Sequence, residues 1–147
     1  MNCKLFIIYT ADDCGACVTF KKTHLIKLLS LLEDNKSRCI KIRQINVSSI
    51  GDRSPINNVH PQLIAANKWF PGFYLFDEKE FYDFDSNLSG YVMGGQFVNG
   101  VQKMIKDKEY SYDANHVLNW VLYLTKSKLV NQANEEIGFL NPEKLFT

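Results

Sequence analysis

The chain has 147 residues, of which 46% are hydrophobic, and its charges nearly cancel to a formal net charge of +1. This length suits one domain with a core of its own, so one domain is expected. No segment approaches the roughly 20 apolar residues that a membrane-spanning helix needs. Lys and Arg form no basic run or stripe, so neither nucleic acid nor a membrane surface is an expected partner.

The N-terminal residues do not have the sequence pattern of a secretory leader. Its apolar run covers only residues 5–9 and is soon followed by Asp12 and Asp13, whereas a leader needs an apolar stretch of about 7–15 residues. The expected location is therefore cytoplasmic, where ordinary thiols are kept reduced. In that setting the four cysteines favour redox or metal chemistry over a framework of structural disulfides.

The first third of the chain predicts a strand, a helix and a second strand. Residues 5–9 are β-branched and aromatic without polar alternation, which is typical of a central strand buried on both faces. From Cys17 onward, apolar residues at helical spacing predict one helix of about four or five turns. Residues 39–47 alternate apolar and polar, and the intervening helix makes this second strand parallel to the first.

The middle of the chain predicts a loop, a short helix and a third strand. Residues 48–59 contain glycine, proline and paired asparagines, so they form a loop on the rim where α/β sheets usually hold ligands. Arg53 and His60, in or beside this loop, are interpreted as solvated residues rather than substrate contacts. A short helix over residues 61–67 precedes Pro71 and a strand over residues 73–76.

The last third predicts an insert and two helices. Residues 77–90 are acidic and aromatic, and residues 81–84 within them could form a hairpin with the third strand. After Gly94 and Gly95, apolar residues from Phe97 to about residue 105 recur at helical spacing and predict an amphipathic helix. Asp113 is the predicted N-cap of a last helix. The predicted buried face of this helix consists of Val117, Trp120, Val121 and Leu124. The domain is assigned to residues 1–128, with residues 129–147 as a C-terminal tail.

The segment Cys14-Gly15-Ala16-Cys17 stands between the first strand and the first helix. Backbone N–H groups and the helix dipole stabilise an anion at a helix N-terminus, so Cys14 is expected to be the attacking thiolate. Cys17 lies nearly one helical turn further on, close enough to resolve a mixed disulfide formed at Cys14. Such a dithiol exchanges two electrons per cycle without a cofactor.

The residues around the pair set the expected direction of exchange. Asp12 and Asp13 place negative charge beside Cys14, which opposes thiolate formation unless their side chains turn to solvent or cap the helix. Neither Pro nor His stands between the cysteines. A reductant is therefore favoured over a strong disulfide donor.

The order of these elements, with the Cys-x-x-Cys segment, a proline before the third strand and Met93-Gly94-Gly95, resembles the thioredoxin superfamily. Within that superfamily it is most similar to the glutaredoxins, over roughly residues 4 to 125. The resemblance implies an α/β, thioredoxin-like fold with a central mixed sheet of about four strands flanked by helices. It also implies an enzyme, a thiol-disulfide oxidoreductase that exchanges disulfides in protein substrates.

The same resemblance implies the roles of the site residues. Cys14 and Cys17 would be catalytic, with Gly15 and Ala16 between them against the substrate. The Phe70-Pro71 bond would be cis, with Pro71 facing the cysteines and the backbone of Phe70 pairing with an extended peptide. Glutathione is left open as a co-substrate and a reductase as a partner.

Two other functions stay open. The fold could serve as a binding module in which the cysteine pair is incidental and the insert at 77–90 makes the contacts. A zinc site is less favoured, because Cys3, Cys39 and the three histidines offer no second close pair of ligands.

Four further residues receive a prediction. Cys3 and Cys39 open adjacent parallel strands at the end opposite Cys14, so they could be neighbours, and they are interpreted as free buried thiols. His24 is interpreted as a helix-surface residue that is too far along to touch either sulfur. Trp69 is interpreted either as part of a peptide groove or as a core residue.

Overall fold

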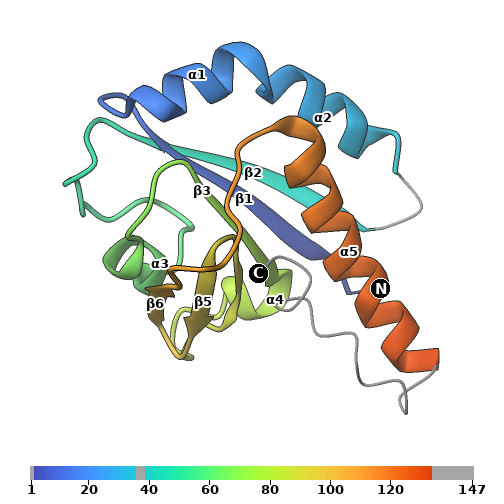
Figure 1. The fold of residues 1–147 in the computed structure, drawn as a ribbon. Helices are drawn as coiled ribbons and strands as arrows, with labels where there is room; N and C mark the ends of the chain where they lie inside the picture. Colours follow the sequence, from blue (N-terminus) through green and yellow to red (C-terminus); the bar gives the residue numbers. More distant parts are fainter. Residues whose placement is uncertain (1, 36–38, 134–147) are drawn as a thin grey trace.

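The computed structural model describes residues 2–35 and 39–133, and a mixed, open six-stranded sheet forms its centre (Figure 1). The strand order is β2-β1-β3-β4-β5-β6, so the expected α/β class is confirmed and the sheet has two strands more than expected. The strands are β1 (Lys4–Ala11), β2 (Ile40–Val47), β3 (Gly72–Asp77), β4 (Gly90–Val92), β5 (Gly95–Val98) and β6 (Val101–Met104).

Strand β1 is central, as its unbroken apolar run predicts. It pairs with β2 in parallel and with β3 antiparallel, and residues 5–11 are all buried. Because side chains alternate across a strand, Leu5, Ile7 and Tyr9 enter one core and Phe6 and Ile8 enter the other. The chain therefore has two hydrophobic layers with β1 between them.

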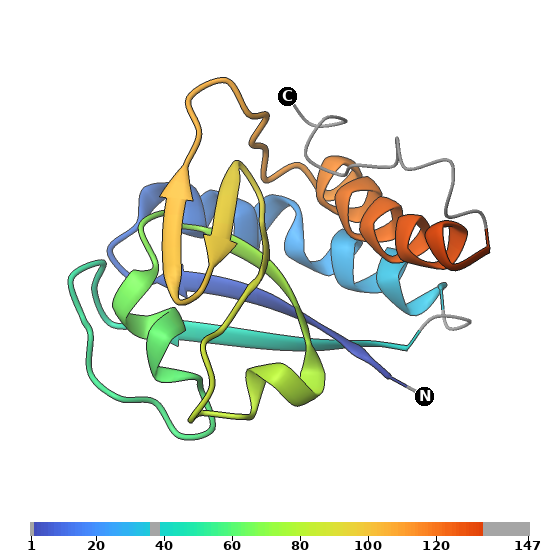
Figure 2. The ribbon, with the colours of Figure 1, turned by 90° about the horizontal axis from the view of Figure 1, so that it is seen from below.

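The two faces of the sheet carry different helices. The helices α1 (Gly15–Thr23), α2 (Leu25–Glu33) and α5 (Ala114–Ala133) cover one face, and α3 (Pro61–Ala66) and α4 (Glu78–Phe81) cover the other (Figures 1 and 2). The predicted short helix corresponds to α3. Residues 114–133 confirm the predicted last helix, which runs past the expected domain end at residue 128. The rest of the predicted tail, 134–147, lies outside the described residues.

The single helix predicted after Cys17 is wrong, because His24 separates α1 from α2. The His24 backbone has φ −122°, which is not helical. Its imidazole is half-buried, with Nδ1 3.4 Å from the backbone nitrogen of Ala114 and 3.8 Å from an Asp113 carboxylate oxygen. The break thus lies where the N-terminus of α5 docks. Apolar spacing continues across it, so the sequence carries no sign of the break.

The helix predicted from Phe97 is also wrong, since this segment is the hairpin β5–β6. Val98 pairs with Val101, and the turn residues Asn99 and Gly100 have φ of 50° and 78°. Asn-Gly is the preferred pair for a two-residue turn with positive φ at both positions. Val98 and Val101 are exposed on the hairpin. Their spacing of three residues also fits one face of a helix. The Asn-Gly pair between them is the sequence feature that indicates the hairpin.

Residues 81–84 form no hairpin with β3, whose second neighbour is β4. The insert instead begins with α4, where the Asp77 side chain accepts a hydrogen bond from the Glu80 backbone. Phe81 is fully buried, and its ring lies 5.5 Å from that of Phe76. Burial of Phe81 and Leu88 in the same core holds the segment against the sheet.

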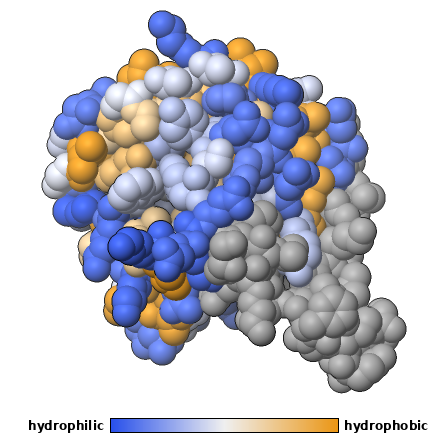
Figure 3. Space-filling model, in the orientation of Figure 1, coloured by the Kyte–Doolittle hydropathy of each residue, from blue (hydrophilic) through white to orange (hydrophobic). Residues whose placement is uncertain are grey.

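Asp113 caps α5 as predicted, since its carboxylate accepts hydrogen bonds from the backbones of Asn115 and His116. The predicted apolar face of α5 is buried in the core that α1 and α2 share. Within the described ranges no helix is both long and apolar enough to cross a membrane. On the face in Figure 3, hydrophobic residues form small separate patches among hydrophilic ones.

Candidate redox site

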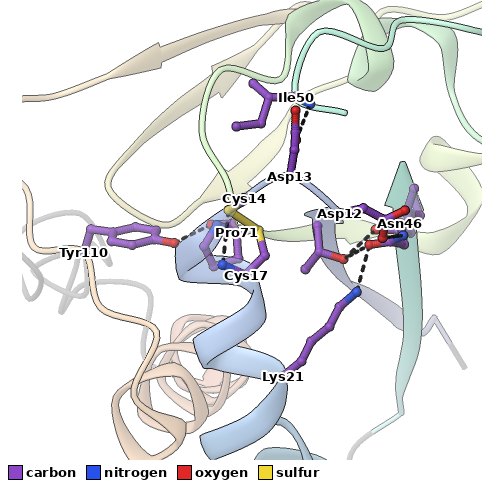
Figure 4. The surroundings of a disulfide bond; sticks show 11 residues. Asp12, Asp13, Cys14, Cys17, Lys21, Asn46, Ile50, Pro71 and Tyr110 are labelled. Carbon is purple, nitrogen blue, oxygen red and sulfur yellow. Dashed lines mark hydrogen bonds between the residues drawn. A yellow bond between two sulfur atoms is a disulfide. The ribbon is translucent and has the colours of Figure 1, made fainter. Parts of the chain in front are cut away.

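Cys14 lies at the N-cap of α1, directly after the turn that follows β1. Its backbone is extended (φ −99°, ψ 111°), and its sulfur accepts a hydrogen bond of 3.1 Å from the Cys17 N–H (Figure 4). The first amides of a helix have no intrahelical acceptor and carry the positive end of the dipole. The position expected from the sequence is confirmed, and it stabilises negative charge on the sulfur of Cys14 in the reduced protein.

Cys14 and Cys17 form a disulfide, with their Cα atoms 5.2 Å apart. Both are buried, but Cys14 keeps 5% of its surface exposed and Cys17 only 1%. Gly15 is exposed, and a Cβ built there would have no neighbour within 4 Å. Solvent therefore reaches the pair from the side of Gly15 and Cys14. An attacking thiol must be the more accessible of the two, and a resolving thiol can be buried.

The two acidic residues before the pair neither cap α1 nor extend freely into solvent. Asp12 accepts a 2.8 Å hydrogen bond from the Asn46 amide, and Asp13 accepts one of 2.9 Å from the Ile50 backbone (Figure 4). Lys21 donates to the Asn46 oxygen at 2.8 Å. The Asn46 side chain thus links Asp12, just before the cysteine pair, to Lys21 on α1.

Phe70 and Pro71, which directly precede β3, lie at the same end of the sheet as the cysteine pair. Their peptide bond is cis, as expected, and Figure 4 draws Pro71 in the surroundings of the disulfide. Phe70 packs against the core cluster that contains both cysteines, and its ring lies 5.4 Å from that of Tyr9. The structure therefore brings Cys14, Gly15, Ala16, Cys17, Phe70 and Pro71 to one end of the sheet.

Two aromatic residues, Trp69 and Tyr110, lie next to each other at this end of the sheet. The sequence alone did not predict that they form a pair. Tyr110 donates a hydrogen bond to the carbonyl of Pro71 (Figure 4), and its ring lies 5.7 Å from that of Trp69. Trp69 is 47% exposed, so it is not a core residue. No motif marks Tyr110, because it belongs to the connection between β6 and α5.

A buried polar group underlies the site. The Tyr74 hydroxyl lies between the amide oxygens of Asn67 and Gln102, at 2.6 Å from the second. Burial raises the pKa of Tyr74 well above its ordinary value, so the phenol is neutral at physiological pH. Arg53, interpreted as solvated, is exposed but donates a 2.9 Å hydrogen bond to the Asn67 carbonyl. These contacts hold the rim loop to the end of α3.

His60, interpreted as a solvated loop residue, is buried with 1% exposure. Its Nδ1 accepts from the Gln62 backbone at 3.1 Å and caps α3. Because Nδ1 accepts, Nε2 carries the proton and donates to the Ser86 carbonyl at 2.9 Å. His60 therefore links α3 to the insert at 77–90 and is not a solvated residue. The pattern Xaa-Pro at a helix start was its only signal.

Cys3 and Cys39 are not free thiols, because they form a second disulfide with a Cα separation of 4.7 Å. The pairing of Lys4 with Ile40 places the two preceding cysteines side by side. This bond lies at the start of β1 and β2, the end opposite Cys14. Among the described residues, no three or more His, Cys, Asp or Glu side chains form a group that could hold a metal ion.

No protein-family model matches the chain, and neither a curated protein nor a solved structure does.

Proposed function

We propose that the protein is a thiol-disulfide oxidoreductase with a thioredoxin-like fold that acts on disulfides in protein substrates. The observation that carries the proposal is the Cys14–Cys17 disulfide at the N-terminus of α1. A pair at this position joins an anion-stabilising helix end to a resolving thiol three residues later.

The sheet topology supports the fold proposal. In the order β2-β1-β3-β4, β2 is parallel to β1, while β3 and β4 each run antiparallel to their preceding neighbour. Helices α1 and α2 connect the parallel pair, and α3 precedes β3. The resemblance to the thioredoxin superfamily implies a mixed sheet of about four strands with Pro71 before the third, and these four strands are compatible with it. Helix α4 is an addition to that plan, and the hairpin β5–β6 replaces the helix that was expected after Gly94 and Gly95.

The proposed reaction starts from the reduced dithiol. The Cys14 thiolate attacks one sulfur of a substrate disulfide, which forms a mixed disulfide and releases the other sulfur as a thiolate that takes up a proton. Cys17 then loses its proton and attacks the sulfur of Cys14. This step restores the bond seen here and releases the second substrate thiol. The substrate gains two electrons and two protons, and the dithiol loses them.

A thiol donor must reduce the Cys14–Cys17 bond again. Two molecules of glutathione, which become one molecule of glutathione disulfide, balance that step, and a dithiol of a reductase balances it equally. No cofactor is required for either. We propose the cytoplasm as the location, where such donors are abundant; the Cys3–Cys39 disulfide is then an exception to the rule that ordinary thiols are kept reduced there. Reduction of the substrate is the proposed direction, because neither Pro nor His lies between the two cysteines.

A binding module is the second candidate. Tyr82 and Phe84 in the insert are 40% and 41% exposed, and exposed aromatic rings are typical of contact surfaces. In that case the insert would carry the function and the cysteine pair would be incidental. Both candidate functions use the same fold, but only the oxidoreductase would reduce substrate disulfides over many turnovers. A catalytic assay therefore distinguishes them.

A catalytic assay tests the proposal. Wild-type protein at one hundredth of the insulin concentration, with dithiothreitol as the thiol donor, is expected to reduce the insulin disulfides over many turnovers. The measurement is the rate of insulin precipitation above the rate with dithiothreitol alone. A rate equal to that background, from protein whose Cys14 still reacts with iodoacetamide, would favour the binding module.

A further inference from the structure

The segment at 105–113 connects β6 to α5 and brings Tyr110 near Pro71 and the Cys14–Cys17 disulfide (Figure 4). Tyr110 from this segment donates a hydrogen bond to the carbonyl of Pro71 (Figure 4). Pro71 is buried and lies one residue before β3 begins. Its carbonyl is thus held by a side chain that arrives from 39 residues further along the chain.

The ring of Tyr110 is fixed by several parts of the fold. It lies 5.7 Å from the ring of Trp69 and 6.1 Å from that of Phe73. Gly94 has φ +84°, and a Cβ added there would lie 3.3 Å from the Cβ of Tyr110. A glycine at this position therefore supplies both the positive φ and the space that the tyrosine occupies.

We infer that Tyr110 is a positioning residue for the proposed exchange reaction, holding the Phe70-Pro71 backbone in place beside the Cys14–Cys17 pair. The inference rests on the proposed function. A protein substrate must place its disulfide at Cys14 and its chain along this neighbouring backbone. A backbone that is already ordered loses less conformational freedom when the substrate binds, which tightens binding without changing the reacting sulfurs.

Tyr110 keeps its proton throughout this role. Burial is the main cause that raises the pKa of Tyr110, and the Trp69 side chain offsets part of the rise. A phenol with a pKa above its ordinary value is protonated at neutral pH, so the hydroxyl remains a hydrogen-bond donor to Pro71. Tyr110 therefore takes no part in proton transfer to either sulfur.

Tyr110→Phe tests the inference, because it removes the hydroxyl and keeps the ring. We expect the KM for insulin to rise roughly three- to tenfold, as loss of one hydrogen bond implies, while kcat changes by less than about twofold. The rate at which iodoacetamide alkylates reduced Cys14 should stay unchanged. Tyr112→Phe is the matched control, since Tyr112 contacts the rings of Phe20 and His24 instead of Pro71, and its kinetics should equal those of wild type.

Hydrogen exchange gives a second readout that does not depend on turnover. The backbone amides of Phe70 and Gly72 should exchange faster in Tyr110→Phe than in Tyr112→Phe. If wild type reduces insulin but Tyr110→Phe leaves both the KM and the exchange rates unchanged, the inference is overturned. The proposed function is then unaffected. A parallel fall in kcat, alkylation rate and melting temperature would assign Tyr110 a general structural role and would also overturn it. Wild-type protein without turnover would remove the proposed function itself.

Discussion

Replacing Cys14 by serine is expected to lower the turnover of insulin disulfides by roughly 1,000-fold or more, to the rate of the thiol donor alone. A serine hydroxyl stays protonated at neutral pH and cannot form a disulfide with the substrate. Cys17 is not expected to substitute for it, because Cys17 is only 1% exposed and is the third residue of α1. The measurement is kcat/KM for insulin reduction.

Val18→Ser is the matched control for this variant. Val18 follows the pair on the same helix and is 49% exposed, so the change adds a hydroxyl near the site without touching a sulfur. Its kcat/KM should lie within about twofold of wild type, as is usual for an exposed position. If Cys14→Ser retained a tenth or more of the wild-type rate, Cys14 would not be the attacking thiol.

Replacing Cys3 and Cys39 together by alanine is expected to lower the free energy of unfolding by about 4 kcal/mol. The bond joins residues 36 positions apart, and a cross-link that closes a loop of this length removes about that much loop entropy from the unfolded chain. A domain has only about 5–15 kcal/mol of stability in total. Urea unfolding of wild type and variant, both without reductant, measures the difference.

Cys14→Ala with Cys17→Ala is the comparison for this loss. That bond spans only three positions, so the same entropy argument predicts a clearly smaller destabilisation. We therefore expect the Cys3–Cys39 disulfide to stabilise the fold more than the Cys14–Cys17 disulfide, which we propose is the exchangeable one. A loss below about 1 kcal/mol for the Cys3 and Cys39 variant would show that this bond is not the main cross-link.

The features that sequence reasoning placed correctly are those set by neighbouring residues. An unbroken apolar run makes β1 central, and a Cys-x-x-Cys segment directly after it meets the start of α1. Asp113 before an apolar periodicity marks the cap of α5. Each of these follows from rules that act within about one helical turn or one strand.

The features that it missed depend on contacts between distant segments. The break at His24 arises where Ala114 docks, and the burial of His60 depends on a carbonyl of Ser86. Tyr110 enters the site because it hydrogen-bonds Pro71. Such contacts follow from the tertiary arrangement, which periodicity along the chain does not report.

The disulfide between Cys3 and Cys39 is an intermediate case. Sequence reasoning placed both residues at the same end of two parallel strands and still interpreted them as free thiols. The register of β1 against β2 decides the matter, since a shift by one or two residues would separate the cysteines. Register is fixed by the whole sheet and by α1 and α2, so it was not readable from either strand alone.

The central claim is that Cys14 attacks substrate disulfides and Cys17 resolves the product, and trapping the mixed disulfide tests it most directly. Cys17→Ser, incubated with insulin without reductant, should accumulate an adduct of Cys14 with an insulin chain, visible by intact-protein mass spectrometry and reversed by dithiothreitol. Cys14→Ser should form none. Absence of any adduct on Cys17→Ser, while its Cys14 remains reactive toward iodoacetamide, would contradict the account.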